Sequence, residues 1–454
     1  MRNRVIHTQG TAEAILPSAS DTGAVGLAID SNNTPYVAFA DTGNGNRATA
    51  YRFNGTAWTL VGTAGFSVGA AAYISMAIDS NNVPYVAYQD SANGNRAIVM
   101  RFNGTNWVTA GSPGFSTGEV AYVSIAIDSN NVPYVAFDGA IGSTFKATVM
   151  KFNGTSWVVV GNAGFSASSA LFTSIAIDRN NVPYVSYEDF AYNYRATVTK
   201  FNGTSWVTVG TPGFSVGGVN YMTIATDTNN IPYVAFQDSA NGYKATVMRF
   251  NGTSWVTVGT PGFSAGEVLF TSIAMNSSNV PYVAYADVAY QVRATVMAYN
   301  GASWATVGIP GFSADGVSDT IIAIDRNNTP YIAYHDYANG GNVSVMKYTG
   351  TSWEAVGCPI ASGSRRQAFQ THVIQLLEAQ ARMARCLSFF FCRMLQEISG
   401  DPDITVEKKV RLAEDLLCAA AKKDEALADV IESLVDLARE MQRGLRPRNR
   451  TPLR

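Results

Sequence analysis

The chain has 454 residues, of which 47% are hydrophobic and only 15% are charged, and its formal net charge is −2. This balance gives no strong attraction to nucleic acid or to a membrane surface, so we expect neither as a partner. The first residues lack the apolar segment of a secretory signal, which predicts a cytoplasmic protein. The longest apolar stretch, Cys386 to Cys392, is too short to span a bilayer.

A single sequence unit recurs seven times between the N-terminus and residue 357. Its markers are a Phe-Asn-Gly-Thr-Ser-Trp motif and a Pro-Tyr pair, and the tryptophans are spaced by 49 residues with one step of 50. The seven tryptophans are Trp58, Trp107, Trp157, Trp206, Trp255, Trp304 and Trp353. A fixed period of this length is typical of stacked supersecondary units that cannot bury their apolar faces alone.

One copy, from Tyr221 to Gly259, contains four predicted strands in chain order. Residues 222–227 alternate with the period of two that indicates a half-buried strand, and 228–230 form a turn. Residues 232–236 form the second strand, with Pro232 at its first position, where a missing N–H costs least. After a turn at 239–242, strands at 245–250 and 255–258 flank Asn251-Gly252, a strong hairpin signal. A glycine-rich link then leads to the next copy.

Seven units of four antiparallel strands predict a mainly β protein with a seven-bladed β-propeller over residues 1–357. We expect each tryptophan to pack in the groove between blades as a structural residue. The N-terminal copy departs from the pattern, because Gln9 stands where a tryptophan would be and Pro17 replaces the usual phenylalanine. The way in which the ring closes between the first and last copies is therefore open.

The repeat resembles known propellers. The pattern from Ile78 to Tyr88, followed by the Phe-Asn-Gly-Thr-x-Trp and Gly-Phe-Ser motifs, is similar to the highly repetitive propellers of bacterial proteins. It resembles the kelch, WD-repeat and NHL propellers more distantly, without a WD dipeptide or a kelch double glycine. The resemblance implies a binding platform without specifying the ligand.

Differences between the copies gather in the link after Gly-Phe-Ser and in the loop between the second and third strands. Both connections should emerge on one face of the propeller, where binding residues of a rigid scaffold usually lie. We therefore predict a protein- or glycan-binding face, although aromatic packing between blades would explain the same pattern. The link residues are Tyr73, Tyr122, Phe172, Tyr221, Phe270, Asp319, Glu119 and Glu267, and the loop residues are Phe145, Phe190, Tyr192, Tyr194, Tyr243, Tyr290 and Tyr337.

Motifs of enzyme chemistry are missing, so we expect no catalytic residue, no cofactor and no metal. Histidine occurs three times and no nucleophile-elbow, Walker or zinc-protease motif is present. The Asp79-Ser-Asn-Asn82 motif lacks the glycine and glutamate of a calcium loop, which favours a hairpin turn. Asp90 and Arg96 recur as a pair across the same loop in most copies, which predicts a hairpin ion pair.

The last part of the chain has a different sequence pattern. We predict a linker at 358–364, a small all-α segment of three helices at 365–443 and a disordered basic tail at 444–454, because apolar residues recur at helical steps and Gly400 and Pro402 end the first helix. The Phe389, Phe390 and Phe391 run exceeds what one helix face needs and predicts self-association or partner docking. All four cysteines lie from residue 358 onward without a zinc-ligand pattern.

Three functional hypotheses follow from the sequence. The first is a non-enzymatic platform with one composite protein- or glycan-binding site on the propeller and helices that oligomerise or recruit a partner. The second is a multivalent lectin with near-identical sites between blades. The third is an engineered fusion in which the propeller is a rigid carrier.

Overall fold

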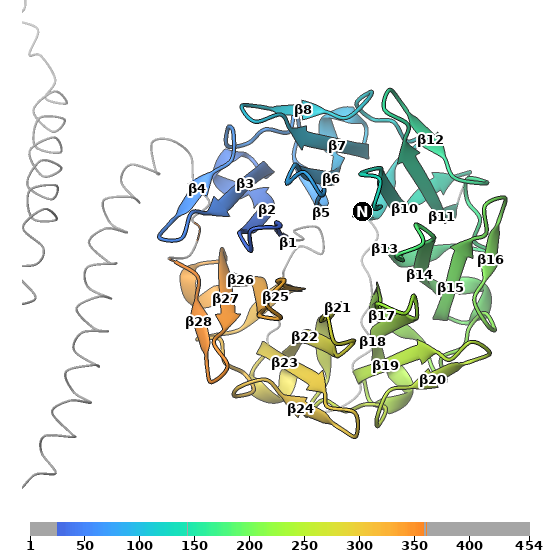
Figure 1. Ribbon diagram of the computed structural model, residues 1–454. Helices are drawn as coiled ribbons and strands as arrows, with labels where there is room; N and C mark the ends of the chain where they lie inside the picture. The colour runs from blue at the N-terminus through green and yellow to red at the C-terminus, as the bar shows by residue number, and fades with distance from the viewer. Residues whose placement is uncertain (1–24, 143, 358–359, 361–454) are drawn as a thin grey trace, which may run out of the picture. The chain divides into compact units, whose positions relative to one another are not determined.

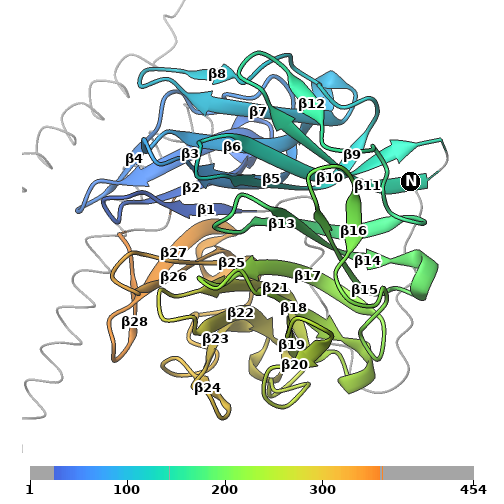
Figure 2. The same ribbon diagram turned by 45° about the vertical axis from the view of Figure 1, so that its right-hand side comes forward.

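The computed structural model describes residues 25–142, 144–357 and 360, and all of these belong to the propeller. The structure contains seven four-stranded sheets. Figure 1 shows the sheets arranged in a ring, and Figure 2 shows the same ring obliquely. Each sheet consists of four strands that are consecutive in sequence and antiparallel. The predicted seven-bladed propeller is therefore confirmed. The predicted linker, helices and basic tail, with Phe389 to Phe391 and the cysteines, lie outside the described residues except Ile360.

The first four blades have these bounds. Blade 1 has β1 (Gly26–Ile29), β2 (Pro35–Asp41), β3 (Arg47–Phe53) and β4 (Trp58–Leu60). Blade 2 has β5 (Ala71–Ile78), β6 (Pro84–Asp90), β7 (Arg96–Phe102) and β8 (Trp107–Thr109). Blade 3 has β9 (Val120–Ile127), β10 (Pro133–Ile141), β11 (Thr144–Phe152) and β12 (Trp157–Val159). Blade 4 has β13 (Ala170–Ile177), β14 (Pro183–Asp189), β15 (Arg195–Phe201) and β16 (Trp206–Thr208).

The last three blades repeat this plan. Blade 5 has β17 (Val219–Thr226), β18 (Pro232–Asp238), β19 (Lys244–Phe250) and β20 (Trp255–Thr257). Blade 6 has β21 (Val268–Met275), β22 (Pro281–Asp287), β23 (Arg293–Tyr299) and β24 (Trp304–Thr306). Blade 7 has β25 (Val317–Ile324), β26 (Pro330–Asp336), β27 (Asn342–Tyr348) and β28 (Trp353–Ala355). The first strand of each blade lies nearest the central channel and the fourth lies at the rim (Figure 1).

A short 3-10 helix fills the loop between the second and third strands in blades 1, 2 and 4–7. These helices are η1 (Thr42–Asn44), η2 (Ser91–Asn93), η3 (Phe190–Tyr192), η4 (Ser239–Asn241), η5 (Val288–Tyr290) and η6 (Tyr337–Asn339). An aspartate precedes each one and accepts a hydrogen bond from the backbone N–H two residues on, as Asp90 does from Ala92 at 2.8 Å. The predicted Asp90–Arg96 ion pair is therefore wrong, because the carboxylate is buried at the helix cap; within the described part of the chain, no salt bridge joins the two residues.

The apolar core is divided into seven clusters, and each cluster lies between two neighbouring blades. Between blades 1 and 2, for example, Ala38 and Ala50 pack with Val86, Tyr88 and Ile98. Burying a large apolar side chain contributes about 1.5–3 kcal/mol. Because these side chains are buried only where two blades meet, each blade depends on its neighbours for this stabilisation. This arrangement explains why the repeat occurs as a closed set.

The tryptophans lie in these grooves as predicted. Trp107 stacks on Phe66 of the preceding link with ring centroids 4.5 Å apart, and its Nε1 donates to the Val61 carbonyl at 2.7 Å. The pattern recurs with the Phe of each Gly-Phe-Ser motif up to Phe312 and Trp353. Gly62, at φ 72°, packs on the same indole as Phe66, and a Cβ there would lie 2.9 Å from Trp107 Cδ1.

The ring closes between blades 7 and 1 by the same contacts that join the other blades. Trp58 donates its Nε1 to the Val356 carbonyl at 2.5 Å, and Val25, Leu27 and Phe39 share a core with blade 7. Ile360 pairs with Val343 and lies in that core. Because every blade is built from consecutive strands, no strand is exchanged at the closure within the described ranges.

A ring of asparagines joins the turns between the first and second strands. Asn82 accepts a hydrogen bond from the Ser31 N–H of the preceding blade at 2.9 Å, and the remaining blades repeat this contact. The contact from the Arg326 N–H to Asn33, at 3.1 Å, completes the circle. The Asp-x-Asn-Asn motif thus forms the predicted turn, and its last asparagine also links neighbouring blades.

Candidate functional site

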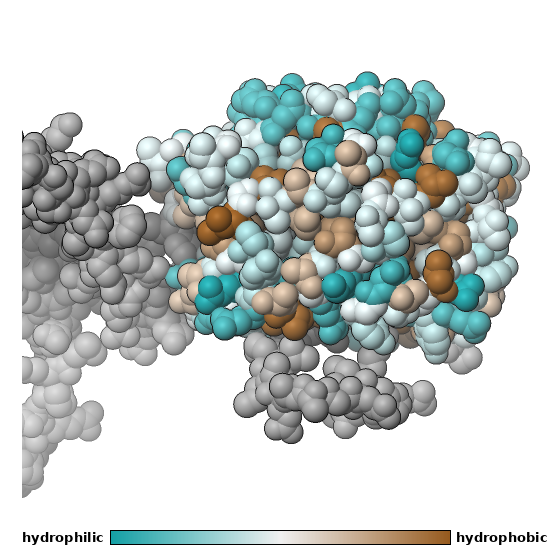
Figure 3. Space-filling view, turned by 90° about the horizontal axis from the view of Figure 1, so that it is seen from below, coloured by the Kyte–Doolittle hydropathy of each residue, from teal (hydrophilic) through white to brown (hydrophobic). Residues whose placement is uncertain are grey.

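We call the face that carries the links and the loops between second and third strands the upper face, and the opposite one the lower face. The channel has an upper mouth, which the predicted link residues approach, and a lower mouth, which the Asp-x-Asn-Asn turns surround. On the side of the ring shown in Figure 3, strongly apolar residues occur mostly singly among paler and hydrophilic ones. At the channel mouths residues of neighbouring blades come together, which makes the mouths the candidate ligand-binding surfaces.

Five of the predicted link residues form a continuous aromatic girdle around the upper mouth. Each ring contacts the ring of the next blade, with centroids 4.8 to 5.3 Å apart and planes inclined by 46 to 53°. The members, in order, are Tyr73, Tyr122, Phe172, Tyr221 and Phe270. All five are partly exposed. The same rings therefore pack between blades and remain accessible to a ligand, so the two roles are compatible.

The girdle residues have a strained backbone. Their φ angles lie between 49 and 55°, in the left-handed region that bulky side chains rarely adopt. The cause is a bulge in each first strand, where the register with the second strand shifts, as between Ala72 and Ser75. Such strain persists only where the surrounding structure enforces it, and it is concentrated at functional sites in proteins.

Blade 7 interrupts the girdle with an acidic residue. Asp319 has the same backbone conformation, with φ 53°, but carries a carboxylate whose Oδ2 lies 4.0 Å from His335 Nε2. His335 Nδ1 lies 3.0 Å from the Gly341 carbonyl, which can only accept, so this nitrogen carries the proton. The upper mouth therefore combines an aromatic arc on blades 2–6 with one polar position on blade 7.

The two predicted link glutamates are held by amides beside the mouth. Glu119 accepts from Asn95 Nδ2 at 3.1 Å and Glu267 accepts from Gln237 Nε2 at 3.3 Å. Burial raises the pKa of the Glu267 carboxyl above its ordinary value. Neither glutamate belongs to the girdle.

The predicted loop aromatics lie where the second and third strands of blades 3–7 connect. Tyr194, Tyr243 and Tyr192 are 52%, 47% and 41% exposed. Phe190 packs edge-on against Tyr194 with centroids 4.6 Å apart. The others are Phe145, which lies in β11, Tyr290, which covers Gly311 of the adjoining link, and Tyr337, which begins η6. The structure thus brings the link aromatics together but leaves the loop aromatics apart from them.

The sequence analysis missed two sets of residues. The first is a buried second-strand position near the upper mouth, occupied by Asp138 in blade 3 and Glu188 in blade 4. Burial, with the nearby Glu188 charge as a further cause, raises the pKa of Asp138 well above its ordinary value, against a hydrogen bond from Thr173 that lowers it. Aligning the copies would have exposed this set, because Gln89 and Gln237 stand at the same place.

The second missed set lies at the lower mouth. Two polar recesses occur there, one including Arg326 and the other Arg179. Arg179 and Arg326 occupy the second position of the turn between the first and second strands. The other five blades have serine or threonine at that position, so the two arginines could have been detected as exceptions in the sequence. Within the ranges that the structure describes, no group of three His, Cys, Asp or Glu side chains could hold a metal ion, and no helix is long and apolar enough to cross a membrane.

Comparison with known proteins adds likeness of fold. No protein-family model and no curated protein sequence matches the chain. The BP39L lectin from Burkholderia pseudomallei is similar in structure, with 14% identity and a TM-score of 0.55 over 74% of this chain and 99% of that one. An ulvan lyase of polysaccharide lyase family PL25 has 13% identity and a TM-score of 0.50 over 74% of this chain and 96% of its own.

The Aleuria aurantia lectin, solved as a mutant in complex with α-methyl-L-fucoside, has 12% identity and a TM-score of 0.48 over 76% of this chain and 97% of that one. At such identities the likeness extends to the fold alone. The chain is a seven-bladed β-propeller with four-stranded antiparallel blades, and propeller lectins are among its structural neighbours.

Proposed function

We propose that this protein is a non-enzymatic glycan-binding propeller that takes a saccharide at the upper mouth of its channel. The observation that carries the proposal is the girdle from Tyr73 to Phe270, in which five contacting rings keep a strained backbone on consecutive blades. Aromatic faces stack against the C–H face of a sugar ring, and the Asp319 carboxylate is a polar group beside the arc.

The interruption at Asp319 makes this a composite site rather than seven equal ones. A saccharide that extends along the arc meets successive aromatic rings and, at blade 7, a carboxylate with an adjacent imidazole. This asymmetry favours one composite site over a set of identical sites between blades. The carbohydrate-related names of the two neighbours with TM-scores of 0.55 and 0.50 support the choice of a glycan over a protein ligand.

A polysaccharide lyase is the second candidate function, and the Asp319–His335 pair is the observation that favours it. An imidazole whose Nδ1 proton is held by the Gly341 carbonyl can accept a proton at Nε2, as an elimination requires. Incubation with an acidic polysaccharide separates the two candidates. Absorbance from an unsaturated uronate product that is lost in His335→Gln would favour the lyase, and binding without turnover would favour the lectin.

The binding test uses saturation-transfer NMR and calorimetry with neutral methyl glycosides of fucose, galactose, glucose and mannose. Tyr122→Leu should weaken binding about two- to tenfold, which corresponds to the 0.5–1.5 kcal/mol typical of an aromatic contact beyond its area. Tyr122→Phe is the matched control, because blades 4 and 6 already carry Phe172 and Phe270 there. Equal binding by the leucine variant, once its folding is verified, would refute the girdle as the site.

A further inference from the structure

The second residue of each turn between the first and second strands, which follows an aspartate in six blades and Asn276 in blade 6, can vary without affecting the ring. Only its backbone N–H is used, as the donor to the asparagine of the next blade. Five blades place a hydroxyl side chain at this position, namely Ser31, Ser80, Ser129, Thr228 and Ser277. Blades 4 and 7 place Arg179 and Arg326 there, and both side chains are exposed.

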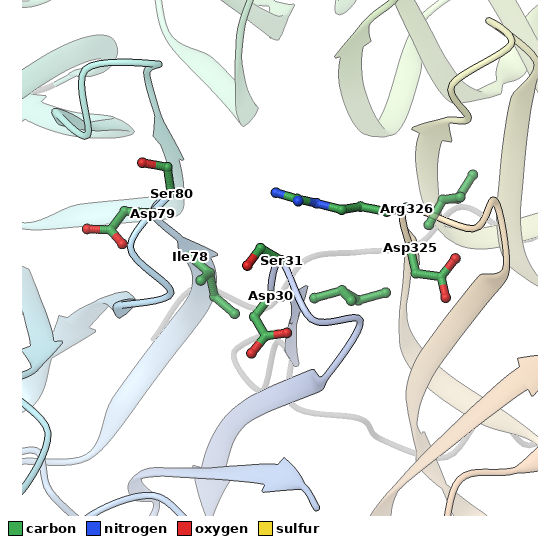
Figure 4. Close-up of a pocket in the computed structure, with 9 residues that line it drawn as sticks. Asp30, Ser31, Ile78, Asp79, Ser80, Asp325 and Arg326 are labelled. Carbon is green, nitrogen blue, oxygen red and sulfur yellow. The ribbon is translucent and has the colours of Figure 1, made fainter. Parts of the chain in front are cut away.

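Arg326 forms one side of a recess at the lower mouth. Figure 4 shows its side chain extending from blade 7 toward Ser31 of blade 1 and Ser80 of blade 2, while the carboxylates of Asp30, Asp79 and Asp325 point away from the guanidinium. Ile29, Ile78 and Ile324 line the same recess, whose volume is about 170 Å³. Three consecutive blades thus contribute a guanidinium, two hydroxyls and an apolar lining.

Arg179 begins a second recess of the same design. Its partners are Thr228 on blade 5 and Ser277 on blade 6, and Ile177 and Met275 supply the apolar lining. The volume is about 300 Å³. In both recesses an arginine is followed by a hydroxyl residue on the next blade and another on the blade after it, whereas Ser129 of blade 3 lies outside both.

The chemistry of these recesses suits a neutral polyol. Arginine supplies donors, hydroxyl side chains both donate and accept, and the aliphatic side chains can contact the C–H face of a sugar. Six aspartates surround the lower mouth, so an anion would meet repulsion there. Each of these carboxylates already accepts two backbone N–H groups of its turn, as Asp30 does from Asn32 and Thr34 at 2.8 Å. The arginines are not similarly engaged: no salt bridge holds either guanidinium within the described residues.

We propose that the lower mouth carries two saccharide subsites, one at Arg326 and one at Arg179, each of which takes a neutral sugar residue. This inference rests on the proposed glycan-binding function and adds sites on the face opposite the girdle. A branched or long glycan, or two glycans, could therefore be held at both mouths of one propeller.

The test follows methyl signals of the full chain by NMR during titration with the neutral methyl glycosides named above. Met275 lies in the Arg179 recess and Ile78 and Ile324 lie in the Arg326 recess, whereas Met222 follows girdle residue Tyr221. In the natural protein we expect the glycoside to change the chemical shifts of these lower-mouth methyl groups. The change at Met275 should be absent in Arg179→Ser, and the changes at the two isoleucines should be absent in Arg326→Ser. Serine preserves the backbone donor of the asparagine contact and is the natural residue in four other blades.

Ser129→Ala is the control, because it alters the same turn position outside both recesses and should change no shift. A chemical-shift change at Met222 without any change at Met275, Ile78 and Ile324 would overturn the lower subsites and leave the proposed function intact. If none of the four methyl signals changes and no glycoside shows saturation transfer, both the lower subsites and the proposed glycan-binding function are refuted. Tighter binding of a methyl glucuronide than of every neutral glycoside at the lower methyls would overturn the neutral-sugar assignment.

Discussion

Replacing Asp138 by asparagine should make the protein more stable near neutral pH. The side chain is fully buried; Oδ1 accepts a hydrogen bond from the Thr173 hydroxyl, whereas Oδ2 is buried without a hydrogen-bond partner. A buried polar group without a partner costs about 1–3 kcal/mol, and a charged one costs more. Because asparagine keeps the shape and removes the charge, we expect the free energy of unfolding to rise by about 1–3 kcal/mol.

The sign of the pH dependence follows from the direction of the pKa shift. Burial raises the pKa of Asp138 well above its ordinary value of 3.8, so the folded protein holds this proton more tightly than the unfolded chain. The stability of the natural protein should therefore fall as the pH rises from about 3.8 through the raised pKa. The asparagine variant should lack this contribution, and its advantage should shrink below that range.

Urea unfolding followed by tryptophan fluorescence provides the assay, since the indoles lie between the blades. The control is Asp238→Asn, because Asp238 Oδ2 accepts from Asn241 Nδ2 and Thr246 Oγ1, both at 2.8 Å. An amide NH₂ facing those donors should cost roughly 1 kcal/mol, so the same substitution should have opposite signs at the two positions. A loss of stability in Asp138→Asn at neutral pH would refute the reasoning and indicate that the carboxylate has a favourable ionic partner.

Two further predictions concern the contacts between blades. Asn33→Gly keeps the left-handed backbone at φ 62° but removes the acceptor for the Arg326 N–H, so unfolding should be easier by about 0.5–1.5 kcal/mol. Asn131→Gly in the middle of the ring should cost the same by urea titration, and a much larger loss for Asn33→Gly would contradict equivalent closure. Trp107→Phe removes the 2.7 Å bond to the Val61 carbonyl and part of the stack on Phe66, and should cost roughly 1–3 kcal/mol. An unchanged midpoint of unfolding would show that the indole nitrogen is dispensable.

The strands, turns and tryptophan grooves could be predicted from sequence because their causes are local and recur seven times. In blade 5 the expected strands at 232–236 and 245–250 correspond to β18 (Pro232–Asp238) and β19 (Lys244–Phe250). The hairpin ion pair was wrong for a reason that spacing does not show. Asp238 and Lys244 face each other in register, yet the carboxylate accepts from the Ala240 N–H at the start of η4.

The girdle was only half predictable. Spacing placed Tyr122 and Phe172 in equivalent links, but that pattern did not separate packing between blades from a ligand surface. Their contact, at 4.8 Å between centroids, depends on a bulge in each first strand and on the position of the next blade. It is a property of two neighbouring blades together, and no single copy of the sequence contains it.

A propeller of near-identical blades offers a physical criterion for separating structural from functional residues. Residues that hold one blade to the next must recur in every copy, because each interface is the same; Trp255 and Asn230 meet this requirement. Residues that depart from the pattern in one or two blades cannot serve that purpose, and Asp319, Arg179 and Arg326 depart while the backbone around them is unchanged. Their side chains lie at the two mouths of the channel, where the departures are accessible to a ligand. The asymmetry of a ring built from a repeated unit therefore adds, beside the exposed girdle, an independent indication of where it binds.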